Sequence, residues 1–264
     1  LLVPPTFVQV DGKDFGTVVE EKLAATGDDW KGVSLADAQD SMFNADKAKA
    51  QLAKAKEALQ AEGVQFPIHI DYVVDQSAAT LVQQADSMKD SIEKTLGKEN
   101  VIVDVQKLST EDADNATYFA QTPDQKDFDL DIGGWGPDFQ DPSTYLDIFN
   151  PTDGASLAGL GINPATDQAV IEKLGLNEYK KLLDEANAEQ LDTTARYEKY
   201  ATAQAWLTDN AIAFPIYSKG GVPSITKVKP FTKAFSLIGI KDGSSYYKYM
   251  ELQSDTVTTA DYEK

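Results

Sequence analysis

Three short apolar runs decide the fold of this chain: "FPIHIDYVV" (66–74), "VIVDVQKL" (101–108) and "FDLDI" (128–132). The first is apolar almost without interruption from Ile68 to Val74, which is typical of a strand in a sheet that is covered on both faces. We therefore expect the three runs to be neighbouring strands of one sheet.

Helices are expected between these strands. A helix over 77–96, ended by Gly97, places a set of apolar residues at helical spacing on one face: Leu81, Ala85, Met88, Ile92 and Leu96. Ser109, with Asp112 three residues later, predicts the start of a second helix that runs to about Ala120. The resulting order β-α-β-α-β implies an α/β fold with a parallel sheet wound by helices.

Helices are also expected outside this unit. In "NADKAKAQLAKAKEALQAEG" (44–63), Asn44 is a good N-cap and Gly63 suits the left-handed residue that ends a helix. The lysines of this run lie mostly off its apolar stripe, which favours a solvated face over an anion-binding patch. The chain also predicts a helix after Asp141-Pro142, helices over 177–188 and 193–210, a strand over 211–217, and a β-rich region from Lys219. Residues 1 to about 40 are expected to be irregular, because glycine and proline recur there.

Composition narrows the class of protein. The 264 residues include 42% hydrophobic residues, enough for a real core. Asp and Glu number 43 against 24 Lys and Arg, and the net charge of -19 makes nucleic acid an unexpected partner. The absence of cysteine excludes disulfides and thiol nucleophiles. No apolar run approaches the roughly 20 residues of a membrane helix, and no signal peptide is visible. The start at Leu1, without an initiator methionine, suggests a piece of something longer.

The residues of common catalytic sites are sparse. His69 is the single histidine, so neither a usual transition-metal site nor a Ser-His-Asp triad is expected, and we predict no metal and no cofactor. Carboxylates do cluster, and a pair of them could serve glycoside hydrolysis. A solvated end of the sheet explains the cluster more simply; its members are Asp127, Asp129, Asp131, Asp138 and Asp141.

Four features together resemble the peptide-binding proteins of ABC importers, the oligopeptide and dipeptide group of extracellular solute-binding protein family 5. "GGWGPDFQDPSTYLDIF" (133–149) is similar to the family signature Gly-Trp-x-x-Asp-Tyr-x-x-Pro-x-x-(Phe/Tyr)-Leu. "ADKAKAQLAKAKEAL" (45–59) resembles an earlier family helix, and the β-α-β-α-β segment follows it. "ARYEKYATAQAWLTDNAIAFPIY" (195–217) resembles a late helix that leads into a proline-centred strand. The resemblance runs from about Val3 to Tyr249.

The resemblance implies a type II periplasmic-binding-protein-like lobe. In this family two lobes close on an extended peptide, so residues 1–218 would be the second, peptide-binding lobe, and 219–264 would return to a first lobe that is mostly missing here. It also implies a monomeric binding protein rather than an enzyme. Its partners would be an oligopeptide, two permease subunits and their ATPases, and it would work outside the cytoplasmic membrane, either periplasmic or as a surface lipoprotein.

The loop after the third predicted strand is the expected ligand site. Ligands of open α/β sheets sit beyond the carboxyl ends of the strands. Gly133, Gly134 and Gly136 leave the backbone uncovered, so a peptide main chain could pair with it. Trp135, followed by Phe139, offers an apolar wall. Asp138 matches the family's acidic position and is expected to bind the peptide's α-ammonium group.

Some alternatives stay open at this point. Trp135 could be a core anchor and Asp138 a turn residue. Ile132 stands where some members carry a carboxylate-binding Arg, and the helix after the first strand has no His, so the ligand's length is undefined and longer peptides are weakly favoured. The same fold could bind a sugar, nickel or another metal chelate, or haem. Two hypotheses come from other classes of protein. One is a carbohydrate-active enzyme that uses the acidic cluster, and the other is a surface adhesion module.

Overall fold

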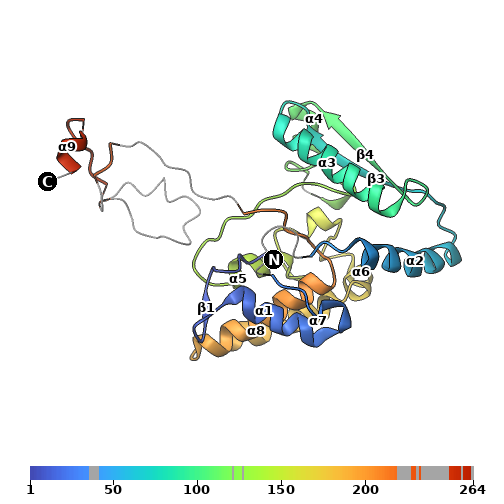
Figure 1. The fold of residues 1–264 in the computed structure, drawn as a ribbon, viewed down its shortest axis with the longest axis horizontal. Coiled ribbons are helices and arrows are strands. Elements are labelled where there is room, and N and C mark those ends of the chain that lie inside the picture. Colours follow the sequence, from blue (N-terminus) through green and yellow to red (C-terminus); the bar gives the residue numbers. More distant parts are fainter. Residues whose placement is uncertain are drawn as a thin grey trace.

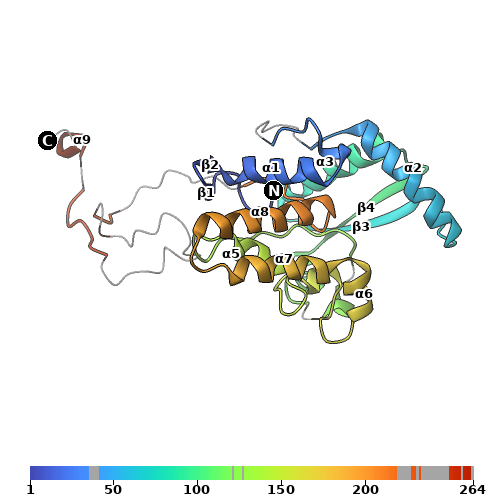
Figure 2. The same ribbon diagram turned by 90° about the horizontal axis from the view of Figure 1, so that it is seen from below.

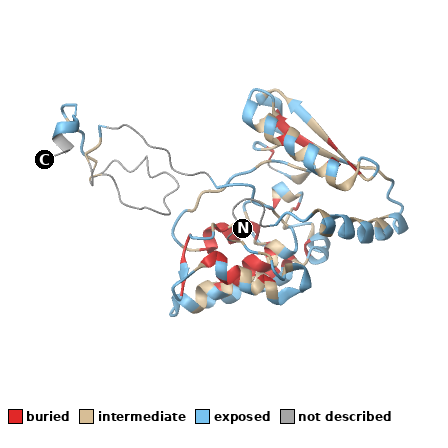
Figure 3. Ribbon diagram, in the orientation of Figure 1, coloured by how far each residue is buried: buried red, intermediate tan, exposed pale blue. Residues whose placement is uncertain are grey.

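The computed structural model of this chain describes residues 1–35, 42–120, 122–126, 128–218, 227–229, 232, 250–256 and 258–262. Its body is built around two separate hydrophobic clusters. The smaller cluster lies between a parallel strand pair and one helix, and the larger one lies among helices, as Figures 1 and 3 show. The mixed α/β class expected from the sequence is confirmed, with more helix and less sheet than the sequence suggests.

Two of the three predicted strands form the parallel pair. β3 (Ile68–Asp75) lies beside β4 (Val101–Leu108), in register from Ile68 opposite Val101 to Asp75 opposite Leu108. Tyr72 and Val74 face the helix between the strands, and Val73, on the opposite face, is also buried. The apolar run therefore reflects cover on both faces at this end of β3.

The third predicted strand is reduced to a single parallel bridge between Leu130 and Tyr72. The backbone amides of Asp129 and Leu130 both donate to the Asp71 carbonyl, at 3.0 and 2.9 Å. The Asp71 amide in turn donates to the Asp129 side chain at 2.9 Å. A carboxylate thus takes the place of the backbone acceptor that would extend the ladder before this bridge.

α3 (Ala79–Leu96) packs on this sheet much as its spacing predicts. Ala85 is fully buried, and Met88 and Ile92 pack beside it, but Val82 takes the place expected for Leu81. The helix also buries one residue that the apolar pattern does not include. Glu93 accepts hydrogen bonds from Lys89 and, at 3.1 Å, from the Val103 amide, and it pairs with Lys98 at 3.1 Å.

The two flanking helices begin where the sequence predicts. In α2 (Ala45–Ala61) the Asn44 side chain accepts from the Lys47 amide at 2.9 Å, and Gly63 has φ +88°. In α4 (Thr110–Ala116) the Ser109 hydroxyl accepts from the Asp112 amide. α4 stops short of the expected Ala120 because its interior holds Asp and Asn, which are weak helix formers.

The prediction that the first 40 residues are irregular is wrong for most of the described part. A hairpin of β1 (Gln9–Val10) and β2 (Lys13–Asp14) leads into α1 (Phe15–Thr26). The glycines mark the boundaries of these elements: Gly12 turns the hairpin with φ +76°, and Gly27 ends the helix. Gly16 is required inside α1, because a Cβ there would lie 2.6 Å from the Cβ of Pro5.

The larger cluster joins the N-terminal segment to the last helices. α7 (Leu176–Ala188) and α8 (Thr193–Asp209) match the predicted ranges, α1 packs against α8, and these helices lie side by side in Figure 2. α5 (Ser143–Leu146) begins after Asp141-Pro142 as expected, and α6 (Gln168–Lys173) precedes α7. Buried anchors include Tyr179, whose hydroxyl donates to the Leu146 carbonyl at 2.8 Å. Single 3-10 turns lie at Asp28–Trp30, Pro123–Gln125, Asp147–Phe149 and Ala158–Leu160.

Beyond α8 the chain is extended. Residues 211–217 form no strand in the described part of the chain, and Phe214, Ile216 and Tyr217 are more than half exposed there. The prediction of a strand is wrong here, because a strand needs a neighbour to accept its hydrogen bonds. Most of the β-rich region expected from Lys219 lies outside the described residues; Val228 and Leu252 form an antiparallel bridge, and α9 spans Thr259–Tyr262. No described helix is both long and apolar enough to cross a membrane.

Candidate ligand-binding loop

The predicted site is the loop from Gly133 to Asp141, which connects the edge of the parallel sheet to α5. It starts three residues after Leu130, which forms the bridge to Tyr72 of β3. A Cβ placed on Gly133 or Gly134 would meet nothing within 4 Å. The backbone at these two positions is therefore open to an approaching chain.

Trp135 is half-buried at the base of the loop. Its indole Nε1 donates to the Thr144 carbonyl at 2.6 Å, and its ring packs against the larger hydrophobic cluster. Part of the indole thus serves the core, as the core-anchor interpretation requires. The rest remains accessible, as a wall for a ligand requires.

Asp138 and Phe139 are both exposed, Phe139 to 54%. The backbone amide of Asp138 donates to the Thr144 hydroxyl at 2.9 Å. Gly136 is half-buried between them and Trp135, so all five predicted site residues lie on one short loop.

The far end of the loop is fixed by a bidentate ion pair. Arg196 of α8 donates from Nε to Asp141 Oδ2 at 2.9 Å and from Nη2 to Asp141 Oδ1 at 3.2 Å. Burial alone would raise the pKa of Asp141, but hydrogen bonds from Arg196 and Ser143, together with the guanidinium charge, lower it below its usual range. Asp141 is therefore a structural anchor that stays ionised.

Arg196 reaches further than this pair. Its Nη1 donates to the carbonyls of Ala186, Asn187 and Glu189 at 3.1 to 3.4 Å, where α7 ends. A guanidinium at the carbonyl end of a helix satisfies acceptors that have no partner inside the helix. One side chain thus joins the loop to both long helices of the larger cluster.

Sequence reasoning missed Thr144 and Arg196. Thr144 lies inside the quoted signature as an unspecified residue, and Arg196 lies 55 positions from Asp141. The signature and the helix start after Asp141 point to the region of Thr144, but neither singles that residue out. No spacing rule connects either residue to Trp135 or Asp138.

Two members of the acidic cluster are engaged within the chain. Asp129 is hydrogen-bonded to the Asp71 amide, Asp141 is held by Arg196, and Asp127 lies outside the described residues. Among residues that the structure describes, no three His, Asp or Glu side chains gather in a way that could hold a metal ion. His69 is exposed on β3, 2.6 Å from Asp104, as a structural strand residue would be.

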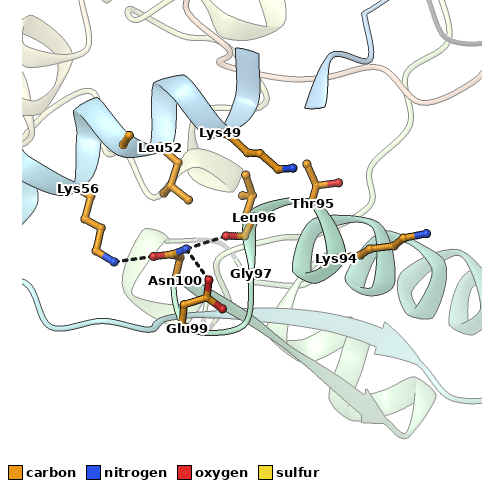
Figure 4. Close-up of a pocket in the computed structure, with 10 residues that line it drawn as sticks. Lys49, Leu52, Lys56, Lys94, Thr95, Leu96, Gly97, Glu99 and Asn100 are labelled. Carbon is orange, nitrogen blue, oxygen red and sulfur yellow. Dashed lines mark hydrogen bonds between the residues drawn. The ribbon is translucent and has the colours of Figure 1, made fainter. Parts of the chain in front are cut away.

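Two hollows of the described surface lie elsewhere, between α2 and the end of α3. The one drawn in Figure 4 has a volume of about 450 Å³ and is lined by Lys49, Lys56 and Lys94 among others. Lys56 reaches across it and donates to Asn100 Oδ1 at 2.6 Å. Neither hollow includes a residue of the Gly133–Asp141 loop.

Comparison with known protein families identifies the family of this chain. Residues 14–156, more than half of it, match the family described as "Bacterial extracellular solute-binding proteins, family 5 Middle". The chain belongs to this family of solute-binding proteins, which confirms the resemblance carried by the Gly-Trp signature.

Several curated relatives cover the whole chain. It is 54% identical to the "Oligopeptide-binding protein AliA" of Streptococcus pneumoniae and 51% identical to the "Oligopeptide-binding protein SarA" of Streptococcus gordonii. The chain spans only 41% and 40% of the lengths of these relatives. A crystal structure described as a "peptide ABC transporter, peptide-binding protein" shares the fold, with a TM-score of 0.53, 22% identity, and coverage of 79% of this chain and 73% of that one.

Proposed function

We propose that this chain is the ligand-binding lobe of a protein that captures oligopeptides outside the cytoplasmic membrane for uptake by an ABC importer. The observation that carries the proposal is the Gly133–Asp141 loop, in a chain that belongs to family 5. Open glycine backbone, a half-buried indole and an exposed carboxylate follow one another there. Relatives with about half of their residues identical are named oligopeptide-binding proteins.

The loop has the chemistry to hold a peptide without reading its sequence. Main-chain hydrogen bonds at Gly133, Gly134 and Gly136 would be independent of the peptide's side chains. Trp135 and Phe139 would cover apolar side chains of the ligand. Asp138 would bind the α-ammonium group, and a charge-assisted hydrogen bond of this kind contributes roughly 1.5–3 kcal/mol when it is desolvated.

The proposal also covers the lobe arrangement, the partners and the location of the protein. Residues 1–218 form the second lobe, and 219–264 return to the first. The exposed apolar segment at Phe214–Tyr217 supports this, since it offers strand-forming residues that have no neighbour within the described chain. Partners are two permease subunits and their ATPases. The protein is a monomer, binds no nucleic acid and catalyses no reaction, and it works outside the cytoplasmic membrane, either in the periplasm or as a surface lipoprotein.

Mass spectrometry of peptides that co-purify with the two-lobed protein containing this chain tests the proposal. We expect a mixture of peptides with free N-termini and varied sequences, retained after gel filtration. Recovery of a sugar, a metal chelate or haem would assign the same fold to another ligand. Turnover of chromogenic glycosides, lost on substitution of Asp129 or Asp131, would instead support the carbohydrate-active alternative.

A further inference from the structure

Thr144 makes two hydrogen bonds to the loop that carries the proposed site. It is the second residue of α5, all four residues of which are buried, and it is itself 6% exposed. A residue so enclosed is in no position to cover a ligand. Its contacts with the loop are therefore contacts that position other residues.

The two bonds leave from different atoms of Thr144. Its carbonyl accepts from Trp135 Nε1 at 2.6 Å, and its hydroxyl accepts from the backbone amide of Asp138 at 2.9 Å. The first bond sets the direction of the indole. The second holds the backbone of Asp138 without using its carboxylate.

Other contacts hold the rest of the loop. Gln140 donates to the Phe7 carbonyl at 3.3 Å, and Asp141 is clamped by Arg196. Both act after Asp138. Between Trp135 and Asp138 lie Gly136, which limits the chain's conformation least, and Pro137, whose ring fixes its own φ. The hydroxyl bond therefore holds the backbone at Asp138 itself, ahead of the contacts made by Gln140 and Asp141.

We propose that Thr144 is a positioning residue for peptide binding: its hydroxyl fixes the Asp138 backbone so that the carboxylate meets the peptide's α-ammonium group. This inference rests on the proposed function. A pre-placed carboxylate binds more tightly than one that must be ordered on binding, because the ordering cost has already been met in the free protein.

Thr144→Val in the two-lobed protein isolates this bond, because valine keeps the shape and the carbonyl of threonine and removes only the hydroxyl. Thr144→Ser restores the hydroxyl. Thr202→Val is the matched control, since its hydroxyl donates within α8, to the Glu198 carbonyl at 3.2 Å, and not to the Gly133–Asp141 loop. The probe is a random hexapeptide library in free-amine and N-acetylated forms. Dissociation constants are then measured for the best-retained free-amine sequence and for its acetylated form.

We expect Thr144→Val to weaken the free-amine peptide by about tenfold, the scale of one well-placed charge-assisted contact. The acetylated peptide should change by less than about twofold, and Thr144→Ser and Thr202→Val should bind both forms like wild type. Thr144→Ala replaces the valine variant if thermal unfolding shows that the latter is not folded.

Wild-type affinity in Thr144→Val, or equal losses for both peptide forms, would overturn the positioning role and leave the proposed function intact. A wild-type protein that retains peptides but does not distinguish the two forms would remove the Asp138 assignment and this inference with it. A wild-type protein that retains no peptide would refute the proposed function itself.

Discussion

Replacing Arg196 with methionine should cost this chain about 3–5 kcal/mol of unfolding free energy, the usual penalty for leaving one member of a buried ion pair without its partner. The pair is partly buried, with Arg196 18% and Asp141 17% exposed, so the loss should lie toward the lower end of that range. The substitution removes both hydrogen bonds to Asp141 and the bonds to the carbonyls that end α7. Methionine retains most of the aliphatic packing, so the loss is mainly electrostatic.

Two further variants test the cause of this loss. Adding Asp141→Asn to Arg196→Met should recover part of the stability, because a neutral amide costs less to leave unpaired than a carboxylate. Lys199→Met is the matched control on the same helix. Its pair with Glu189 is 40% and 26% exposed, so its removal should cost less than about 1 kcal/mol.

Urea unfolding followed by far-ultraviolet circular dichroism measures all four proteins. The expected order of stability is wild type, Lys199→Met, the Asp141→Asn/Arg196→Met double variant and then Arg196→Met. A loss below about 1 kcal/mol for Arg196→Met, or equal losses for the Arg196 and Lys199 variants, would refute the idea that this ion pair secures the loop.

Two other predictions concern the two cores. Gly154→Ala should destabilise the chain by about 1–3 kcal/mol in the same assay, since its Cβ would lie 2.5 and 2.7 Å from the backbone oxygens of Ile148 and Asn150. Gly159→Ala is the control and should be nearly neutral, because a Cβ there would meet nothing within 4 Å. Equal losses of stability in the two variants would contradict the predicted clash at Gly154. The pKa of Glu93 is lowered to about 2, first by the hydrogen bond from the lysine one turn earlier, so its contribution is full above pH 4.5, the ordinary value, and is lost as pH falls toward 2. The urea midpoint should fall over that window, and Glu93→Gln should flatten the fall; an unchanged slope in Glu93→Gln would count against the assignment.

Local signals predicted several elements well. Asn44 and Ser109 do cap their helices, and the apolar runs at β3 and β4 do pair in parallel. A helix cap is a contact between residues three positions apart, and an apolar run is visible within a single segment. Such information is present in the order of residues.

The failures involve partners that lie far away in the chain. Glu93 can be buried because the Val103 amide and two lysines bind its carboxylate. The helical spacing of apolar residues does not predict this. Before the Leu130 bridge, the Asp129 side chain takes the Asp71 amide that a longer third strand would need. The recurrence of glycine predicts irregular chain where α1 forms, whereas Gly16 allows Pro5 to approach the helix closely.

The candidate site divides in the same way. Gly134, Trp135, Gly136, Asp138 and Phe139 are found by their order alone, since a signature is a local pattern. The residues that hold them are not, because Thr144 acts through a backbone carbonyl and a hydroxyl, and Arg196 arrives from a helix 55 positions away. The positions proposed to contact a ligand can thus be read from one loop, whereas the positions that support the loop require the fold.

The most direct test of the central claim is the affinity of the two-lobed protein for matched peptides, with and without an N-acetyl group, in wild type and Asp138→Asn. We expect Asp138→Asn to weaken free-amine peptides by about tenfold or more and acetylated peptides much less. Asp153→Asn removes the same charge from another exposed loop and should change neither affinity. Unchanged affinity of Asp138→Asn for free-amine peptides would contradict the claim that this loop binds the peptide's amino terminus.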